Sequence, residues 1–254
     1  MHRFDAAING VSLSWLDPYI MLADIDERQP EYRQEITARA IRSGQRISAR
    51  TRLSLTVALK IHITTPNVLT RSHVMQILTE WVGDGGWLTI NTKPDQRLYV
   101  YPDPIPAMGS HLSWTDEIEV TLTAYERPYW EQMYPTVTVI TGTGELVPIG
   151  TIPEAYVEVD VTNKGAGDLT TLTATCATTR IKLEGLNVLP GEHVKIAYTD
   201  KDVLTITAAG VSALANRTAD SSDDLIAYTR QSNIITVEAD QDVMAEFSAR
   251  GRWR

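Results

Sequence analysis

The feature that most constrains the fold is a two-residue alternation that runs without interruption through residues 53–63. Small or polar side chains separate the apolar positions, which are Leu53, Leu55, Val57, Leu59, Ile61 and Ile63. Because successive side chains of a strand point to opposite faces, this pattern predicts a long strand with one face against a core. The same alternation from Trp114 to Ala124 predicts a second strand.

Most of the remaining chain also has the pattern of strands. Alternation at 235–239 and at 243–249, separated by Asp240-Gln241-Asp242, predicts a closing hairpin. Further strands are predicted around 87–91, 97–101, 136–141, 155–163, 170–176, 180–184, 193–199 and 203–208.

One segment has the period of a helix. A single apolar stripe at i, i+3, i+4, i+7 and i+8 predicts a helix over about 70–83, with Thr70 or Ser72 as its cap and Gly83 as its end. A shorter helical turn is expected at 221–229, where Ser221 and Ser222 are candidate caps. The predicted class is all-β, mainly strands with one or two short helices. The stripe consists of Val74, Ile77, Leu78, Trp81 and Val82.

The 254 residues are enough for one large or two modest domains. Three Gly and two Pro residues crowd into 142–153, between two strand-rich halves. We therefore expect an N-terminal domain at 1–141 and a C-terminal domain at 142–254. The short Thr-rich strands of the second half favour a β-sandwich of about 100 residues.

Charge is distributed unevenly along the chain. The net charge of −9 argues against general electrostatic binding to nucleic acid. Between Arg28 and Lys60, eight basic residues stand against two acidic ones, so this segment carries +6 while the rest sums to −15. The segment is interpreted as a hairpin arm around Ser43-Gly44, and two readings stay equally open: a contact with an acidic face of another subunit, or a solvated hairpin. The arm's candidate contact residues are Arg39, Arg42, Arg46, Arg50 and Arg52.

The sequence offers no catalytic arrangement. It has no common hydrolase, nucleotide-binding or zinc-protease motif, its five His are scattered, and the Asp pairs at 200/202 and 240/242 are interpreted as turn residues. The single Cys176 is expected to be a buried strand residue. We therefore predict a protein that is not an enzyme, without catalytic residues, metal or cofactor. The absence of an 18-residue apolar run predicts no membrane span, and the N-terminal residues do not resemble a signal peptide.

An aromatic cluster at Tyr129, Trp130 and Tyr134 allows two interpretations. Exposed rings stack on sugars, whereas Tyr and Trp are also enriched in cores and subunit interfaces. We favour the core or interface.

Nine segments together resemble the distal tail protein (Dit) family of long-tailed, siphovirus-type bacteriophages. They extend over nearly the whole chain. The first half contains the Ile8-Asn9-Gly10-Val11 hairpin, LSLTVALKIHI, LTEWVGDGGWLTIN, KPDQRLYVYP and EIEVTLTAYERPYWE. The second half contains GTIPEAYVEVDV, RIKLEGLNVLPGEHVKI, RQSNIITVEAD and MAEFSARGRW.

The resemblance implies an N-terminal β-sandwich-like domain with one helix that assembles into a hexameric ring, and a galectin-like C-terminal β-sandwich outside that ring. It implies a structural hub in the virion that joins the tail tube to tail-tip, baseplate or receptor-binding proteins. DNA would pass through its channel without specific binding, and assembly would occur in the host bacterial cytoplasm.

Two other functions compete with this one. A carbohydrate-binding, lectin-like module for attachment to the host surface would also use a galectin-like sandwich. A glycosidase or accessory esterase is a weaker alternative. The second half shows no inserted module, which argues against direct sugar binding.

Overall fold

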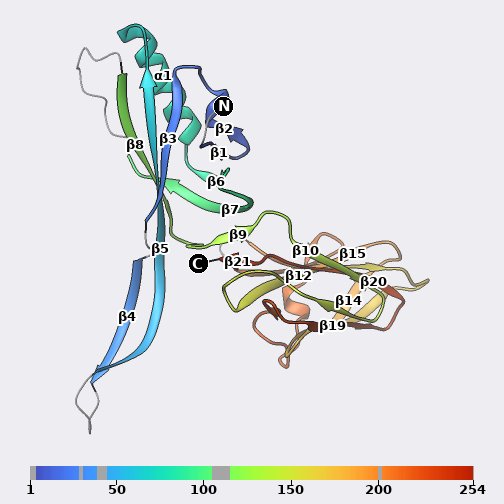
Figure 1. Cartoon of the computed structure of the whole chain (residues 1–254). Coiled ribbons are helices and arrows are strands. Elements are labelled where there is room, and N and C mark those ends of the chain that lie inside the picture. The colour runs from blue at the N-terminus through green and yellow to red at the C-terminus, as the bar shows by residue number, and fades with distance from the viewer. Residues whose placement is uncertain (1–3, 29–30, 39–44, 105–114, 200–201, 254) are drawn as a thin grey trace. The chain divides into compact units, whose positions relative to one another are not determined.

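The computed structural model describes residues 4–28, 31–38, 45–104, 115–199 and 202–253. The chain forms two compact units, Met1–Trp130 and Glu131–Arg254. Both consist mainly of antiparallel strands, as the alternation predicts (Figure 1). The all-β class is therefore confirmed.

The first unit is built around one antiparallel sheet. Its strands follow the order β2-β1-β6-β7-β8-β5-β3, and β4 pairs only with β5. The elements are β1 (Ala6–Ile8), β2 (Val11–Ser12), η1 (Leu13–Trp15), β3 (Ile20–Glu27), β4 (Glu31–Ala38), β5 (Gln45–Thr64), α1 (Val68–Val82), β6 (Gly86–Ile90), β7 (Lys93–Pro102) and β8 (Thr115–Ala124).

Strand β5 is the centre of this unit and contains the predicted alternating segment. From Leu55 to Thr64 it pairs with β8, and its residues from Val57 to Ile63 also pair with β3 on the other side. The odd-numbered side chains from Leu55 to Ile63 are all buried, whereas Leu53 is exposed. The predicted strand is confirmed, and it extends further toward the N-terminus than the alternation indicated.

A tight hairpin opens the unit. Ile8 pairs with Val11, so Asn9 and Gly10 alone form the turn. Both have positive φ angles, 51° and 82°, as a type I′ turn requires. The Asn9 side chain then accepts a hydrogen bond from the Trp87 N–H at 3.0 Å, which joins the hairpin to β6.

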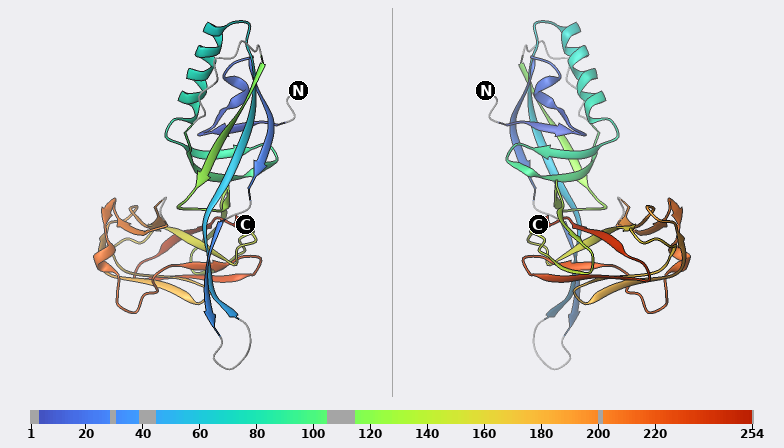
Figure 2. Two further views of the ribbon diagram at one scale, coloured as in Figure 1. Left: turned by 90° about the vertical axis from the view of Figure 1, so that its left-hand side faces the viewer. Right: turned by 90° about the vertical axis from the view of Figure 1, so that its right-hand side faces the viewer.

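Helix α1 is the only α-helix in the described part of the chain, and Figure 2 shows it lying along the first unit's strands. Gly83 ends it as predicted, with a φ of 48° and its N–H bonded to the Thr79 carbonyl at 2.9 Å. The predicted cap is wrong. Asn67 caps the helix, because its side-chain oxygen accepts from the Thr70 N–H at 2.9 Å and the helix starts earlier.

The apolar stripe of α1 faces the core. Val74, Leu78, Trp81 and Val82 are buried and Ile77 is half-buried. The Trp81 indole N–H donates to the Val11 carbonyl at 2.7 Å, so the helix is bonded to the opening hairpin as well as packed in the core. Period 3.6 identified the helix face correctly.

The second unit contains two packed sheets. A seven-stranded sheet has the order β10-β20-β12-β15-β16-β17, with β18 also on β12, and a four-stranded sheet has the order β11-β19-β13-β14. The strand β9 (Trp130–Gln132) begins at the last residue of the first unit. The other elements are β10 (Thr136–Ile140), β11 (Thr143–Leu146), β12 (Glu154–Asn163), β13 (Leu169–Cys176), β14 (Thr179–Val188), β15 (His193–Tyr198), β16 (Leu204–Ala208), β17 (Val211–Ser212), η2 (Leu214–Asn216), β18 (Ile226–Tyr228), β19 (Asn233–Ala239), β20 (Val243–Ala249) and β21 (Arg252–Trp253).

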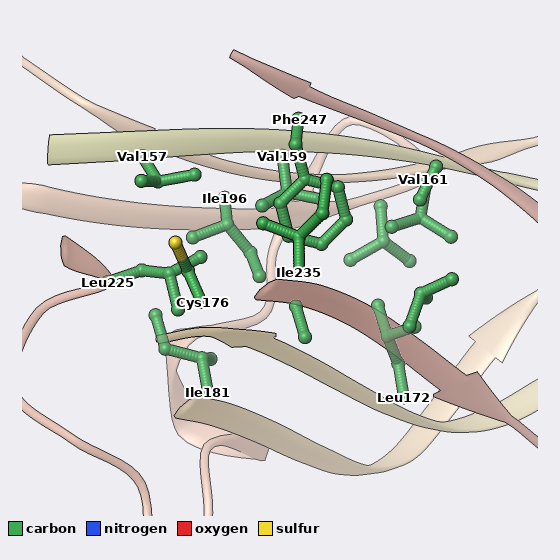
Figure 3. Close-up of a cluster of buried hydrophobic side chains, with 14 of the residues drawn as sticks. Val157, Val159, Val161, Leu172, Cys176, Ile181, Ile196, Leu225, Ile235 and Phe247 are labelled. Carbon is green, nitrogen blue, oxygen red and sulfur yellow. The ribbon is translucent and has the colours of Figure 1, made fainter. Parts of the chain in front are cut away.

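The inner faces of these two sheets meet in a dry core. Figure 3 shows Val159 and Phe247 from the seven-stranded sheet opposite Leu172 and Ile235 from the four-stranded sheet. Cys176 lies in this core, fully buried on β13. Desolvation raises the pKa of its thiol to about 12, so the thiol is protonated and poorly reactive. The prediction of a structural cysteine is confirmed.

The predicted closing hairpin is wrong. Strand β19 pairs with β11 and β13 in the four-stranded sheet, whereas β20 pairs with β10 and β12 in the seven-stranded sheet. The turn at 240–242 therefore connects the two layers of the sandwich. Both strands alternate because each has one face in the same core, and alternation cannot distinguish a connection within a sheet from one between sheets.

The helical turn expected at 221–229 does not form. This segment is irregular up to β18, and its two serines bond to the edge strand β14 instead of capping a helix. The Ser221 hydroxyl accepts from the Lys182 N–H at 2.9 Å, and the Ser222 hydroxyl accepts from the Arg180 N–H at 3.0 Å. A serine satisfies an unpaired N–H equally well at a strand edge or at a helix start.

The two compact units divide between Trp130 and Glu131, earlier than the expected boundary between 141 and 142. The reason is β10, which pairs along its length with β20 and so belongs to the second sandwich. The Gly- and Pro-rich segment 142–153 thus lies inside the second unit. That the two units fold separately stays a prediction.

Candidate assembly surfaces

The predicted arm is a two-stranded ribbon formed by β4 and the N-terminal half of β5. Their register runs from Glu31 opposite Ser54 to Ala38 opposite Gln45. The pairing of β5 with β8 begins at Leu55. Among the described residues, the part of β5 before Leu55 pairs with β4 alone. Figure 1 shows this difference, with β3 and β8 beside the upper part of β5 and β4 beside its lower part. The ribbon confirms the hairpin interpretation of the segment.

The five candidate arginines are placed unequally by the structure. Arg39 and Arg42 lie outside the described residues. Arg46, Arg50 and Arg52 lie on β5, where the backbone register sets them opposite Thr37, Gln34 and Tyr32 of β4. The register shifts by one residue between Arg46 and Arg50, because Glu35 lies opposite Ala49 whereas Ile36 lies opposite Ile47. The backbone therefore places Arg50 and Arg52 on one face of the ribbon and Arg46 on the other.

Several charged side chains of the first unit are paired within their own sheet. Arg28 forms an ion pair with Glu119, and Lys60 lies 3.6 Å from Asp24. These side chains are partly exposed, so each pair contributes less than about 1 kcal/mol. Farther along β5, His62 Nε2 lies 3.3 Å from a Glu117 carboxylate oxygen.

The aromatic segment contributes to the core of the first unit. Trp130 is 1% exposed, its indole N–H donates to Glu27 at 3.0 Å, and the Lys93 ammonium lies 4.6 Å from its ring centre. The other two rings differ, since Tyr129 is half-buried and Tyr134 is 72% exposed. A buried indole cannot stack on a sugar, so the core interpretation holds for Trp130.

Sequence reasoning missed several exposed apolar side chains of the first unit. Trp15 and Leu69 are 79% and 84% exposed, and Val68 is also exposed. Val68 and Leu69 lie at the start of α1 but fall outside the apolar stripe of the helix, and that mismatch was the available signal in the sequence. Large exposed apolar side chains can mark interaction surfaces.

The titratable groups of the second unit form structural contacts. Asp240 accepts hydrogen bonds from the Thr170 hydroxyl and from the Thr170 and Thr171 N–H groups. The Thr170 hydroxyl bond is the main reason why the pKa of Asp240 lies below its ordinary value. Asp202 holds Arg252 at 3.0 and 3.1 Å, while Asp200 lies outside the described residues. Asp202 and Asp240 thus form structural contacts from turn positions.

Among residues 4–28, 31–38, 45–104, 115–199 and 202–253, no group of three or more His, Cys, Asp or Glu side chains is arranged to hold a metal ion. No helix within those ranges is both long and apolar enough to cross a membrane.

The fold of the whole chain has known counterparts, although the sequence does not. No family model matches the sequence, and no curated protein sequence does. Among solved structures, the chain resembles the Dit protein (gp 19.1) of phage SPP1, described as a paradigm of the hub adsorption apparatus in phages that infect Gram-positive bacteria. The TM-score is 0.71 at 12% identity, over 97% of this chain and 98% of that one.

Chains of the phage P2 baseplate in its activated conformation have the same fold. The structure with Ca gives a TM-score of 0.57 at 9% identity, over 98% of this chain and 97% of the other. The structure with Sr gives 0.57 at 8% identity, over 97% of both chains. The chain thus has the fold of the SPP1 Dit protein over nearly the whole length of both chains.

Proposed function

We propose that this chain is a structural phage tail protein, a distal tail protein that forms a hexameric ring joining the tail tube to the tail tip or baseplate. The observation that carries the proposal is the likeness to the SPP1 Dit protein over 97% of this chain and 98% of that one. A shared sandwich alone would be weak support, because sandwiches serve many functions. A match over nearly the whole length of both chains is far more specific.

The surfaces of the first unit support self-assembly. Its ribbon has ten β5 residues, Gln45–Ser54, whose only strand partner is β4, and an isolated two-stranded ribbon is marginally stable in water. A neighbouring subunit would supply the missing contact. In this proposal Arg39, Arg42, Arg46, Arg50 and Arg52 contact an acidic face of that neighbour, where guanidinium groups pair bidentately with carboxylates.

The other exposed surface suits a second kind of partner. The exposed Val68 and Leu69 offer apolar area at the start of α1, where the tail tube protein or a tip protein would bind. The second unit, proposed as the galectin-like domain, would lie outside the ring. The protein would act in the virion without enzymatic activity, after assembly in the host cytoplasm. A net charge of −9 favours passage of DNA through a channel without tight binding.

Light scattering after size-exclusion chromatography, with negative-stain imaging, tests this function. Six copies of the 28.2 kDa chain give about 169 kDa, and class averages should show sixfold rings. A monomer at micromolar concentration that binds sugars on a glycan array would instead favour the lectin alternative. A monomer without glycan binding would contradict both functions for the chain alone.

A further inference from the structure

The outer face of the seven-stranded sheet carries an unbalanced group of acidic side chains. Asp160 on β12 lies directly opposite Glu246 on β20, and Glu158 is two residues along the same strand face. Like charges directly opposite each other across two strands repel. His193 and Lys195 both pair with Asp160, at 2.7 and 3.2 Å. Neither Glu158 nor Glu246 has an ion pair with a residue that the structure describes.

An apolar edge borders these carboxylates. Strand β10 is the first strand of the sheet, and its register places Val139 opposite Glu246 and Val137 opposite Ser248. Both valines are exposed, Val139 to 54%. Strand β10 contains no charged residue or Pro, and both are common means of protecting an edge strand. This open edge and the carboxylates beside it form one continuous surface over β10, β20 and β12.

We propose that this surface receives the basic ribbon of a second copy of the chain. The inference rests on the proposed function, since it names the acidic face that the ribbon contacts in the ring. Arg50 and Arg52, which the register places on one face of the ribbon, would lie over Glu158, Asp160 and Glu246 of the other copy, with the edge of β10 covered by the ribbon.

Charge supports this pairing at two scales. Residues 131–254 contain 17 acidic and 10 basic residues, a balance of −7, whereas residues 31–54 contain six Arg and two Glu, a balance of +4. At the scale of single contacts, Arg50 and Arg52 share the two-residue spacing of Glu158 and Asp160. On any two strands that spacing is about 6.6 Å, so the charges match in register.

Reach also supports it. The ten residues from Gln45 to Ser54 extend roughly 33 Å along the strand. This length extends beyond the pairing of β5 with β8, which ends at Leu55. Strands lie about 4.8 Å apart, so three strands present a surface about 10 Å wide, which a two-stranded ribbon with its side chains can cover.

The other face of the sandwich is a poorer receptor. On the four-stranded sheet, Arg180 pairs with Asp220 at 2.7 Å and Lys182 pairs with Glu184, so β14 supplies its own cations. Its exposed acids Glu145 and Glu238 lie on strands β11 and β19, apart from each other in register. These two residues provide a matched control.

Compensating charge reversals test the contact. In sedimentation velocity at physiological salt, the sheet variant Glu158→Arg/Glu246→Arg and the ribbon variant Arg50→Glu/Arg52→Glu should each weaken association at least about tenfold. The chain with all four changes should recover to within a few-fold of the wild type. The control Glu145→Arg/Glu238→Arg should associate normally. If the four changes together associate no better than either pair, or if the sheet variant behaves as the control does, the contact is wrong.

Disulfide trapping gives a second test that does not depend on affinity. Val139→Cys in one chain, mixed with Gln34→Cys in another, should form mixed dimers under mild oxidation, because Gln34 lies opposite Arg50 on the same face of the ribbon. Thr51→Cys, on the opposite face of the ribbon, should form far fewer. The native Cys176 is buried and should not react, and its protection from alkylation verifies that each variant is folded.

Failure of the proposed ring and failure of this contact alone give different results. A wild-type chain that stays monomeric contradicts the proposed ring and this contact together. Rings that form normally with the sheet variant, and yield no trapped dimer, contradict only this contact and leave that face to a different tail protein.

Discussion

The two halves of β5 form one continuous strand with different surroundings. From Leu55 to Ile63, β3 and β8 flank it, and every second side chain is buried. From Gln45 to Ser54 only β4 is paired with it. The segment from Leu55 to Ile63 is therefore stabilised by a core within the same chain. The segment from Gln45 to Ser54 is stabilised by little more than the hydrogen bonds of one hairpin. A segment that has no core of its own is suited to pack against the surface of another molecule.

The second unit shows the opposite solution. Its two sheets bury their inner faces against each other, and residues such as Val159 and Phe247 are almost inaccessible. Such a sandwich needs no partner for stability, so what it exposes is available for binding. The predictions below separate positions that stabilise the fold from positions that serve assembly.

The largest effect is expected at Trp81, which lies on the buried face of α1. Trp81→Ala should lower the free energy of unfolding of the first unit by about 3–5 kcal/mol, because it opens a cavity and removes the bond to Val11. Differential scanning calorimetry should show an earlier transition for the first unit and an unchanged transition for the second, if the two fold separately.

Trp15→Ala is the matched control. Trp15 is 79% exposed, so its removal should cost less than about 0.5 kcal/mol. Equal losses for the two tryptophans would show that the face of α1 is not the buried one, and a single shared transition would show that the units unfold together.

The halves of β5 can be compared directly with one substitution in each. Leu59→Ala should cost about 2–5 kcal/mol, because Leu59 is fully buried between β3 and β8. Ile47→Ala, on the ribbon, should cost less than about 1 kcal/mol in the isolated subunit. Urea unfolding followed by tryptophan fluorescence measures both. A large loss at Ile47 in a monomer would mean that the ribbon has a core of its own.

Local patterns in the sequence predicted individual elements well. The alternation at 53–63, the stripe of α1 and the Asn9-Gly10 turn all depend on near neighbours, and each formed. These features are specified by backbone periodicity and by the φ angles that Asn and Gly tolerate.

The local sequence pattern did not predict which segments far apart in the chain would pair with each other. The alternation of β19 and β20 is the same whether the two strands pair or face each other across a core, and only the rest of the sandwich decides. The hydroxyls of Ser221 and Ser222 could accept hydrogen bonds from N–H groups at a helix start or at the edge of β14. In the structure they accept from the N–H groups of β14. The boundary was misplaced because β10 completes a sheet whose other strands follow much later in the chain.

A smaller effect is expected at the turn between β19 and β20. Asp240→Ala should cost about 1 kcal/mol, since it removes the acceptor for Thr170 and Thr171, whereas Asp242→Ala, next but one in the same turn, should cost less than about 0.5 kcal/mol. Chemical denaturation followed by circular dichroism measures both.

The pH dependence of the Asp240 contribution has a definite sign. The folded-state pKa is below the ordinary value of 3.8, so the contribution is present above that pH and is lost as the pH falls through the lower folded value. The difference between wild type and Asp240→Ala should therefore shrink below about pH 4. A difference that grows on acidification would contradict the assigned hydrogen bonds.

The smallest effect on stability, with the largest expected effect on assembly, belongs to the ribbon. Reversing Arg42, Arg46 and Arg50 to Glu should change the free energy of unfolding of the isolated subunit by less than about 0.5 kcal/mol, since exposed charges contribute little to the fold. The same three changes should weaken the oligomer, because each one replaces an attraction with a repulsion and the net charge moves from −9 to −15. Native mass spectrometry gives the oligomeric state.

A Lys variant separates charge from geometry at these positions. Arg42→Lys/Arg46→Lys/Arg50→Lys keeps the charge but not the bidentate fork, so intermediate association would indicate paired carboxylates and not a general electrostatic field. Added salt should weaken the wild-type oligomer in the same direction, because the Debye length falls from about 10 Å at 0.1 M to about 3 Å at 1 M. Hexamers that persist after the triple reversal would mean that the ribbon is a solvated hairpin, and that the unpaired half of β5 has a purpose other than assembly.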